Sequence, residues 1–236
     1  MFSSFIRNFS VLFIGVCSAT AGAGGPTWAL PHAQEITRST LELNAGYAQF
    51  PQGGLALARV DVEAPITKHL SGSFIAHEWM ALGLLNQRFF VTGFRYRMDV
   101  SKQLALAPFV QSVFFDGGGA LDRRLTARSG LAVQRRSVNW ALDLSIPIIG
   151  AKNFPTHPAD TSWSPLGILD LLLATETGIT WTGWTNHELR LGIMGTLVRL
   201  SYRTTIKDQP FNAQFASMGS HSFILIGWET SWGSNH

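Results

Sequence analysis

Apolar residues recur at every second position over long stretches of this chain. In VNWALDLSIPI, residues 138–148, large apolar side chains fall mainly at even positions, while Asn139, Asp143 and Ser145 fall at odd ones. Successive side chains of a β-strand point to opposite faces, so the spacing predicts a strand with one apolar and one polar face. Helical spacing from Val138 does not fit, because its i+7 position is Ser145.

The same alternation predicts an all-β fold with about ten antiparallel strands. The segments are residues 40–50, 55–64, 69–79, 88–98, 104–115, 124–134, 138–148, 166–182, 186–206 and 221–232. We expect a bulge or a lapse in pairing at Pro108, which cannot donate to a ladder, and a β-bulge near Gly195, where the ninth segment changes phase. Eight or twelve strands are the alternatives if one hairpin is misjudged, and residues 149–165 are expected to form a surface loop.

Composition narrows the class of protein. The 236 residues fit a single domain, and 46% of them are hydrophobic while 14% are charged, against roughly 25% charged in an ordinary soluble domain. After the N-terminus the long run without Asp, Glu, Lys or Arg is residues 209–228, which contains Pro210 and several polar residues, so membrane-spanning helices are not expected. The net charge of +3 is small and dispersed, which argues against a nucleic-acid partner.

The N-terminus has the features of an export signal. Arg7 precedes the apolar stretch FSVLFIGVC, and the small residues that follow allow cleavage after Ala21, Ala23 or Ala29. We expect a signal peptide over residues 1–23, or up to 29, followed by a periplasmic segment over residues 24–37. An uncleaved anchor helix and a lipoprotein site at Cys17 are the alternatives. Cleavage removes Cys17, the single cysteine, which suits an oxidising compartment.

The polar faces of the strands carry arginines and carboxylates in near balance and contain no lysine. They comprise Arg59, Asp61, Glu63, Arg95, Arg97, Arg128, Asp143, Glu176, Arg190, Arg199, Arg203 and Glu229, with Glu42, Asp170 and Glu188 on the same faces. Arginine is favoured in partly desolvated carboxylate networks, because its planar group binds two acceptors at once. We therefore expect these residues to line an interior, with the apolar faces turned to lipid.

A sheet that faces lipid must pair all of its backbone groups, which requires closure into a barrel. Strands of about ten residues and aromatic residues near strand ends, such as Trp140 and Trp181, match that architecture. Over residues 38–232 the chain resembles a small bacterial outer-membrane β-barrel protein of the porin-like or OmpA-barrel-like class. The resemblance implies export through the periplasm and a place in the outer membrane.

The last segment adds a sharper likeness. Outer-membrane barrels end in a strand of alternating apolar residues with a terminal aromatic, which the barrel-assembly machinery reads; FILIGWETSW resembles that signal, with Trp228 and Trp232 as its aromatics. The chain departs from the pattern by a tail over residues 233–236. Both chain ends are expected on the periplasmic side, so the strand number should be even.

Several roles fit such a barrel. A ten-stranded lumen is narrow enough for side chains to fill, so we favour a bonded plug with a structural or lipid-organising role over a narrow solute pore. An outer-membrane enzyme acting on lipid A or another envelope lipid is one alternative, for which His77 is the best single candidate; we assign no catalytic residue, metal ligand or cofactor. A secreted soluble β-sandwich or lipocalin-like binding protein is the other alternative.

Outer-membrane lipid and lipopolysaccharide are the expected partners. With the ten-strand topology, Arg88, Arg123, Arg124 and Lys207 fall near the outer rim, where guanidinium groups can bind lipopolysaccharide phosphates. The solute and the oligomeric state are left open by the sequence.

Overall fold

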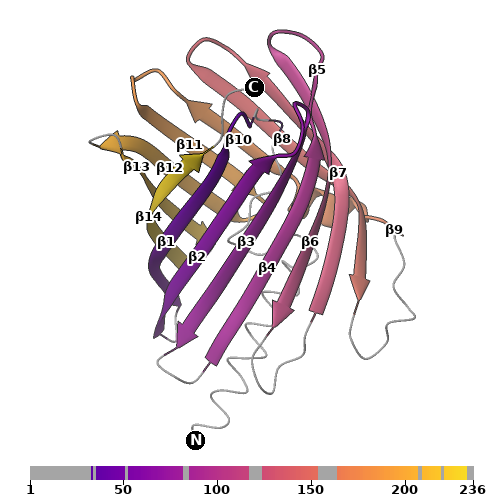
Figure 1. The fold of residues 1–236 in the computed structure, drawn as a ribbon. Coiled ribbons are helices and arrows are strands. Elements are labelled where there is room, and N and C mark those ends of the chain that lie inside the picture. Colours follow the sequence, from indigo (N-terminus) through magenta and orange to yellow (C-terminus); the bar gives the residue numbers. More distant parts are fainter. Residues whose placement is uncertain are drawn as a thin grey trace, which may run out of the picture.

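The chain folds into a closed antiparallel β-barrel (Figure 1). The structure is a computed structural model, and it describes residues 33, 36–50, 53–81, 85–116, 124–153, 164–206, 209–218 and 221–232. The elements are β1 (Ser39–Phe50), β2 (Gly53–Pro65), β3 (Leu70–Ala81), β4 (Leu85–Tyr96), β5 (Met98–Asp99), β6 (Leu104–Asp116), β7 (Arg124–Arg136), β8 (Trp140–Asn153), β9 (Ser164–Pro165), α2 (Ile168–Ala174), β10 (Glu176–Trp181), β11 (His187–Met194), β12 (Leu197–Ile206), β13 (Gln209–Met218) and β14 (His221–Trp232).

Twelve strands build the wall, so the preferred number of ten was wrong and the alternative of twelve was right. β1 pairs with β14, and β10 pairs with β8, which closes the sheet. The two-residue strand β5 continues β4 along β6, and β9 pairs only with residues 149–150 of β8. The proposed signal peptide and the tail 233–236 lie outside the described residues.

Two errors account for the miscount. Gly195 is not a bulge within one long strand: it has a φ of 57° and lies in the tight turn between β11 and β12, which pair from His187 to Met194. A left-handed φ costs glycine little, so the chain reverses there. β13 was assigned to no strand, because Pro210 and the polar residues around it conceal the alternation.

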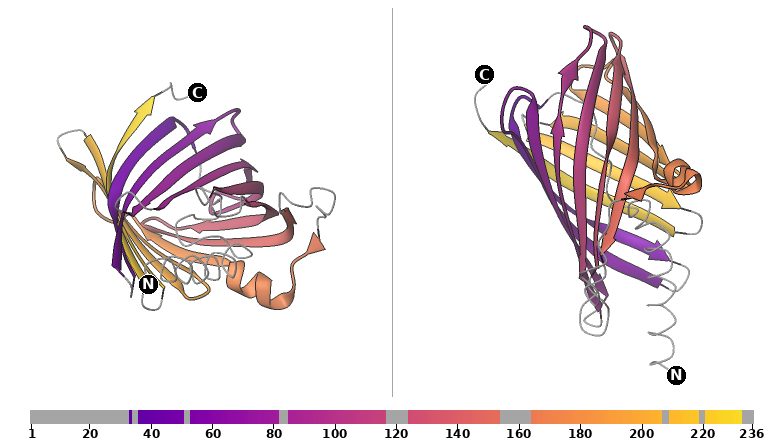
Figure 2. Two further views of the ribbon diagram at one scale, coloured as in Figure 1. Left: turned by 90° about the horizontal axis from the view of Figure 1, so that it is seen from below. Right: turned by 90° about the vertical axis from the view of Figure 1, so that its right-hand side faces the viewer.

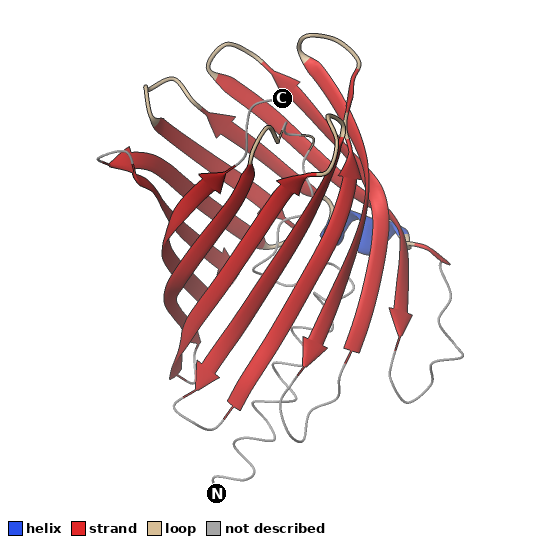
Figure 3. Cartoon of the chain, in the orientation of Figure 1, coloured by secondary structure: helices blue, strands red, loops and turns tan. Residues whose placement is uncertain are grey.

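The first half of the segment predicted as a strand over residues 166–182 is a helix. Residues 169–174 read LDLLLA, which are good helix formers apart from the aspartate. The amides of Leu171 and Thr175 donate to the carbonyls of Gly167 and Leu171, at 2.8 and 2.9 Å. A helix pairs its own backbone N–H and C=O groups, whereas a strand at this position would have no neighbouring strand to pair with. α2 lies outside the barrel wall (Figures 2 and 3), and Asp170 therefore belongs to a helix, not to a strand face.

The arginines and carboxylates of the predicted polar faces point into the barrel, and large apolar side chains cover its outside, as the alternation predicts. Arg59 is 7% exposed, whereas Trp228 is 61% exposed; Leu43, Phe94, Leu142 and Ile226 share the outer face. Because lipid covers that outer face, the exposed apolar residues agree with a membrane location. Among the described residues, no helix is long and apolar enough to span a membrane.

The two ends of the barrel differ. Ser39 and Trp232 pair at the end with the short turns, whereas the chain segments 116–124 and 153–164 connect strands at the other end. Outer-membrane barrels place short turns in the periplasm and long loops outside, so we assign the end with Ser39 as periplasmic and name the other the loop end. The β4–β6 ladder lapses opposite Pro108, as expected, while a bulge that was not expected lies at Ser129 and Gly130.

Candidate functional site

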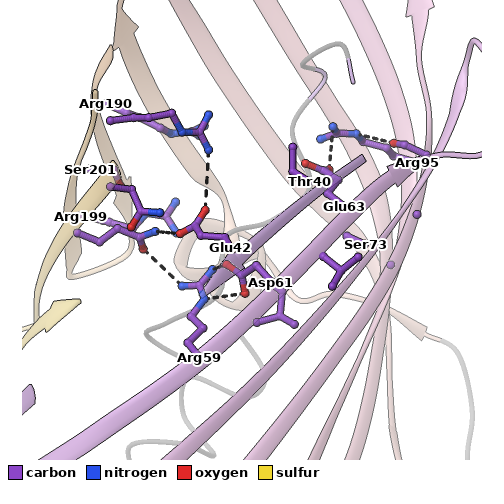
Figure 4. A pocket seen from close by; sticks show the side chains of 18 of the residues that line it. Thr40, Glu42, Arg59, Asp61, Glu63, Ser73, Arg95, Arg190, Arg199 and Ser201 are labelled. Carbon is purple, nitrogen blue, oxygen red and sulfur yellow. Dashed lines mark hydrogen bonds and ion pairs between the residues drawn. The ribbon is translucent and has the colours of Figure 1, made fainter. Parts of the chain in front are cut away.

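The lumen contains a polar cavity of about 240 Å³. Its walls come from β1 to β4, β6 and β11 to β13, and Figure 4 shows their side chains meeting from opposite sides. The lining includes Thr40, Glu42, Arg59, Asp61, Glu63, Ser71, Ser73, Arg95, Gln111, Glu188, Arg190, Arg199, Ser201, Arg203, Asn212 and Gln214. Of the twelve residues predicted to line the lumen, seven lie at this cavity.

Two ion pairs lie on the β2 side of the cavity (Figure 4). Arg59 binds Asp61, with Nη2 2.5 Å from Oδ2, and both residues project from the same face of β2. Arg95 binds Glu63 across the strands at 2.9 Å and donates to the Ser71 hydroxyl at 3.0 Å. Arginine and carboxylate thus satisfy each other inside the barrel, which limits the desolvation cost of both.

A second group of charges lies near the start of β10. Glu176 is 2% exposed and pairs with Arg199, while Arg190 lies 3.7 Å from Glu176 and 3.8 Å from the Asp143 carboxylate. Asp143 also accepts a hydrogen bond from the Gln134 amide at 2.9 Å. One buried carboxylate therefore holds two guanidinium groups from neighbouring strands.

Arg203 joins the last strand to the first. Its guanidinium lies 2.7 Å from Glu229 on β14 and 3.8 Å from Glu42 on β1. Glu42 also accepts hydrogen bonds from Asn44 at 2.8 Å and from Gln214 at 3.1 Å. The charges of β12 thereby cross-link the side of the barrel where the two ends of the sheet meet.

The remaining two predicted arginines have different partners. Arg97 lies near the periplasmic end, where it pairs with Asp99 at 2.5 Å and donates to the carbonyl of Ala33 at 3.1 Å. The hydrogen bond from Arg97 lowers the pKa of Asp99. Arg128 is buried and donates to the side-chain oxygen of Gln111, not to a carboxylate. Ala33 is itself buried in a small apolar cluster with Phe109.

Sequence reasoning missed the amides of the network. Gln111 lies three residues after Pro108, where we expected a bulge or a lapse in pairing, and Asn212 and Gln214 lie on the unrecognised strand β13. Asn212 is buried, and neither its amide nitrogen nor its oxygen has a hydrogen-bond partner in the structure. Once β13 is recognised, alternation places Asn212 and Gln214 on its inner face.

A second zone of the inner wall is apolar. We name it the apolar belt, and it consists of Ala48, Leu57, Phe89, Val91, Met194, Leu197, Ala216, Phe223 and Leu225. All of these residues are buried, and partly buried side chains of Leu55, Ile75 and Val113 pack against them. The belt lies nearer the loop end than the charged residues, as Leu57 and Arg59 show on β2.

The residues expected outside the lumen take several positions. Arg88 lies on the outer face near the loop end and pairs with Glu78 at 3.2 Å, and Arg124 begins β7 at the same end. Arg123 and Lys207 lie outside the described residues. Lys207 was expected near the outer rim because residues 186–206 were read as one strand. The turn at Gly195 reverses the chain, so β12 ends at Ile206 at the periplasmic end, where Ile206 pairs with Gln209.

Trp228 and Trp232 are exposed on the outer face of β14. His77 lies in β3 opposite Phe89. His187 approaches the Tyr202 hydroxyl at 2.7 Å, while the adjacent Glu188 lines the cavity on the other face of the wall. Within the described ranges, no group of three or more His, Cys, Asp and Glu residues is placed to hold a metal ion.

The fold is that of known outer-membrane barrels. The structure is similar to the KdgM porin in complex with disordered oligogalacturonate, with a TM-score of 0.59 and 8% identity over 82% of this chain and 99% of that chain. It is also similar to outer membrane phospholipase A from Escherichia coli, with a TM-score of 0.53 and 9% identity over 89% of this chain and 95% of that chain. No family model matches the sequence, and no curated protein matches it.

The closed barrel and these likenesses define the class. The chain is a bacterial outer-membrane β-barrel protein, with a fold shared by porins and by outer membrane phospholipase A. At such low identity the likeness concerns the fold alone, so the role must be argued from the lumen.

Proposed function

We propose that this barrel is a narrow channel of the outer membrane, and that the arginine–carboxylate network selects the solutes that pass. The observation that carries the proposal is the cavity of about 240 Å³ within the network. Twelve strands enclose a wider lumen than the ten that favoured a plug, since barrel diameter grows with strand number. The fold shared with the KdgM porin adds support.

Conductance in a planar lipid bilayer tests the proposal. We expect small, discrete current steps, and we expect Arg199→Gln to shift the reversal potential toward cation preference, because it removes a positive charge beside Glu176. Val138→Ser is the matched control, since Val138 lies in a periplasmic turn and is exposed. Heat-modifiable migration on an unboiled gel identifies folded protein, and folded protein without current steps contradicts the channel.

A role in lipid contact follows from Arg88. Its guanidinium is half exposed on the outer face near the loop end, and there it can bind a lipopolysaccharide phosphate in exchange for Glu78. Arg88→Gln should weaken co-purification of lipopolysaccharide with the barrel, with Arg135→Gln at the periplasmic end as the control. Equal lipopolysaccharide content in both variants contradicts this role.

We propose no enzymatic role. His187 contacts a tyrosine hydroxyl, and the neighbouring Glu188 faces the lumen, so these two residues do not act as an acid–base pair on one side of the wall. Mass spectrometry of lipid A after expression should show an unchanged acyl pattern. A new lipid A species that depends on the protein would overturn this view.

A further inference from the structure

The polar and apolar zones of the lumen follow one another in the same order on every strand that carries both. On β2, Leu57 lies on the loop side of Arg59, and on β12, Leu197 lies on the loop side of Arg199. β1, β4, β11 and β13 repeat this order, which places the apolar belt on the loop side of the polar cavity along that part of the wall. The belt residues are packed against one another and do not line the cavity, so a solute that leaves the polar cavity toward the loop end must part them.

The polar zone favours a negatively charged group. Five arginines line the cavity with four carboxylates, and Asp143, Glu176 and Glu229, which pair with three of these arginines, lie outside that lining. The side chain of Asn212 is buried at the cavity, and its donor and acceptor atoms have no hydrogen-bond partner among the described residues. A carboxylate or a phosphate can accept from Asn212 and from guanidinium groups such as that of Arg203.

The apolar belt favours a hydrocarbon chain. A hydrated ion would lose its water there without gaining polar contacts. Each methylene group of a ligand that is buried in the belt, by contrast, raises the binding affinity about fourfold. The belt residues are large and aliphatic or aromatic over most of its length, as Phe89, Leu57 and Phe223 show. The two zones together are complementary to a molecule with an anionic head and an apolar tail.

We infer that the solute of this channel is an anionic amphiphile with a single hydrocarbon chain and a carboxylate or phosphate head. The head binds the arginines and Asn212, and the hydrocarbon chain enters the apolar belt as the packed side chains of the belt part. This inference rests on the proposed channel function and names its substrate class.

The wall beside the same site is only partly paired. β10 pairs with β8 only over residues 140–145, and beyond that point α2 takes the place of a strand. α2 exposes Leu169 and Leu172 on the outside. A crevice too narrow for water is lined by Ile193 of the outer face, by Met194 and Leu197 of the belt, and by Gly192 and the buried pair Glu176 and Arg199. The belt and this ion pair thus lie directly behind the outer face at this seam.

Block of the channel current tests the substrate class. Decanoate, gluconate and decyltrimethylammonium are added in turn to a conducting bilayer. We expect decanoate to halve the current at a concentration at least about tenfold below that of gluconate or decyltrimethylammonium, because it alone has both the head and the chain. Equal potency of decanoate and gluconate overturns the inference while the channel stands.

A matched pair of variants tests whether the hydrocarbon chain of the solute contacts the apolar belt. Leu225→Ser changes the belt, whereas Ile226→Ser changes the next residue of β14, which faces lipid. We expect Leu225→Ser to raise the half-blocking concentration of decanoate about tenfold and Ile226→Ser to leave it unchanged. If Leu225→Ser does not fold, Ala216→Ser adds one hydroxyl to the same belt. Equal effects of the inner and outer variants overturn the inference.

A protein without conductance contradicts the channel, and the site is then tested by binding. Radiolabelled decanoate should bind the barrel in nanodiscs more tightly than it binds Leu225→Ser, and equal binding overturns the inference. A disulfide cross-link tests whether the ligand comes from the membrane or from water. The double variant Ile149→Cys/Pro165→Cys, in a Cys17→Ser background, joins β8 to β9, because residues 149 and 165 are paired. Loss of block on oxidation assigns the membrane as the source, and unchanged block assigns water.

Discussion

The two zones of the lumen are held together by different forces. The charged zone depends on specific pairs such as Glu176 with Arg199, in which each member needs the other. The apolar belt depends on non-directional packing among residues such as Leu57 and Phe223. Loss of one partner in a buried ion pair leaves a charge uncompensated, whereas loss of one apolar side chain leaves a cavity. The charged zone should therefore tolerate single substitutions less well than the belt.

The largest effect is expected at Glu176. Glu176→Gln leaves Arg199 and Arg190 without their shared carboxylate, and we expect the free energy of unfolding in lipid vesicles to fall by about 3 kcal/mol. Urea titration followed by tryptophan fluorescence measures it. The double variant Glu176→Gln/Arg199→Gln should recover part of the loss. A double variant less stable than Glu176→Gln would contradict the pairing.

A smaller loss is expected in the apolar belt. Leu57→Ala removes a side chain that is 2% exposed, and a core substitution of this kind costs about 2 kcal/mol or more. Leu43→Ala is the control on the neighbouring strand, because Leu43 faces outward and lipid can fill the space it leaves. The same urea titration compares the two. Equal losses would mean that the belt is not packed as a core.

Arg128 provides a further comparison, because among the described residues it has no carboxylate partner. It donates to the Gln111 amide oxygen, so Arg128→Met removes a desolvated charge and leaves only a neutral amide behind. Replacement of a buried charge by an apolar side chain of similar size is often close to neutral. We expect a change within about 1 kcal/mol, and a loss as large as that of Glu176→Gln would contradict this reasoning.

The smallest effect is expected at Asp99, near the periplasmic rim. Its side chain is half exposed, and exposed ion pairs contribute little. Because Arg97 lowers the pKa of Asp99, the contribution is present above the unfolded pKa and is lost as pH falls through the folded pKa. The difference in stability between the natural protein and Asp99→Asn should thus shrink below about pH 4. A difference that grows on acidification would contradict the sign.

The sequence predicted the features that depend on alternation with a period of two residues. Strand faces, the inward direction of Arg59 and Asp143, and the outward direction of Trp140 all follow from alternation and agree with the structure. Two hairpins were not predicted. β13 begins with Gln209 and Pro210, which weaken its alternation, and only a tight turn at a glycine separates β11 from β12. The helix α2 was missed because a run of leucines fits a buried strand as well as a helix.

The apolar belt could not be recognised as a lumen feature for a related reason. In stretches such as FILI, residues 223–226, both faces of the strand are apolar, so alternation no longer separates inside from outside. The sequence also could not predict which arginine pairs with which carboxylate. Arg203 contacts Glu42 and Glu229 only because the first and last strands meet, which is a property of closure.

The short β8–β10 ladder makes the barrel mechanically uneven. β3 and β4 are bonded to each other from residue 70 to residue 81, but β10 holds β8 only from 176 to 181, and α2 bonds mainly to itself. Amide protons of β10 and of the facing half of β8 should therefore exchange with deuterium before those of β3 and β4. Thermal rupture of the ring should begin at that joint and leave the curved sheet from β1 to β7 as its last ordered part.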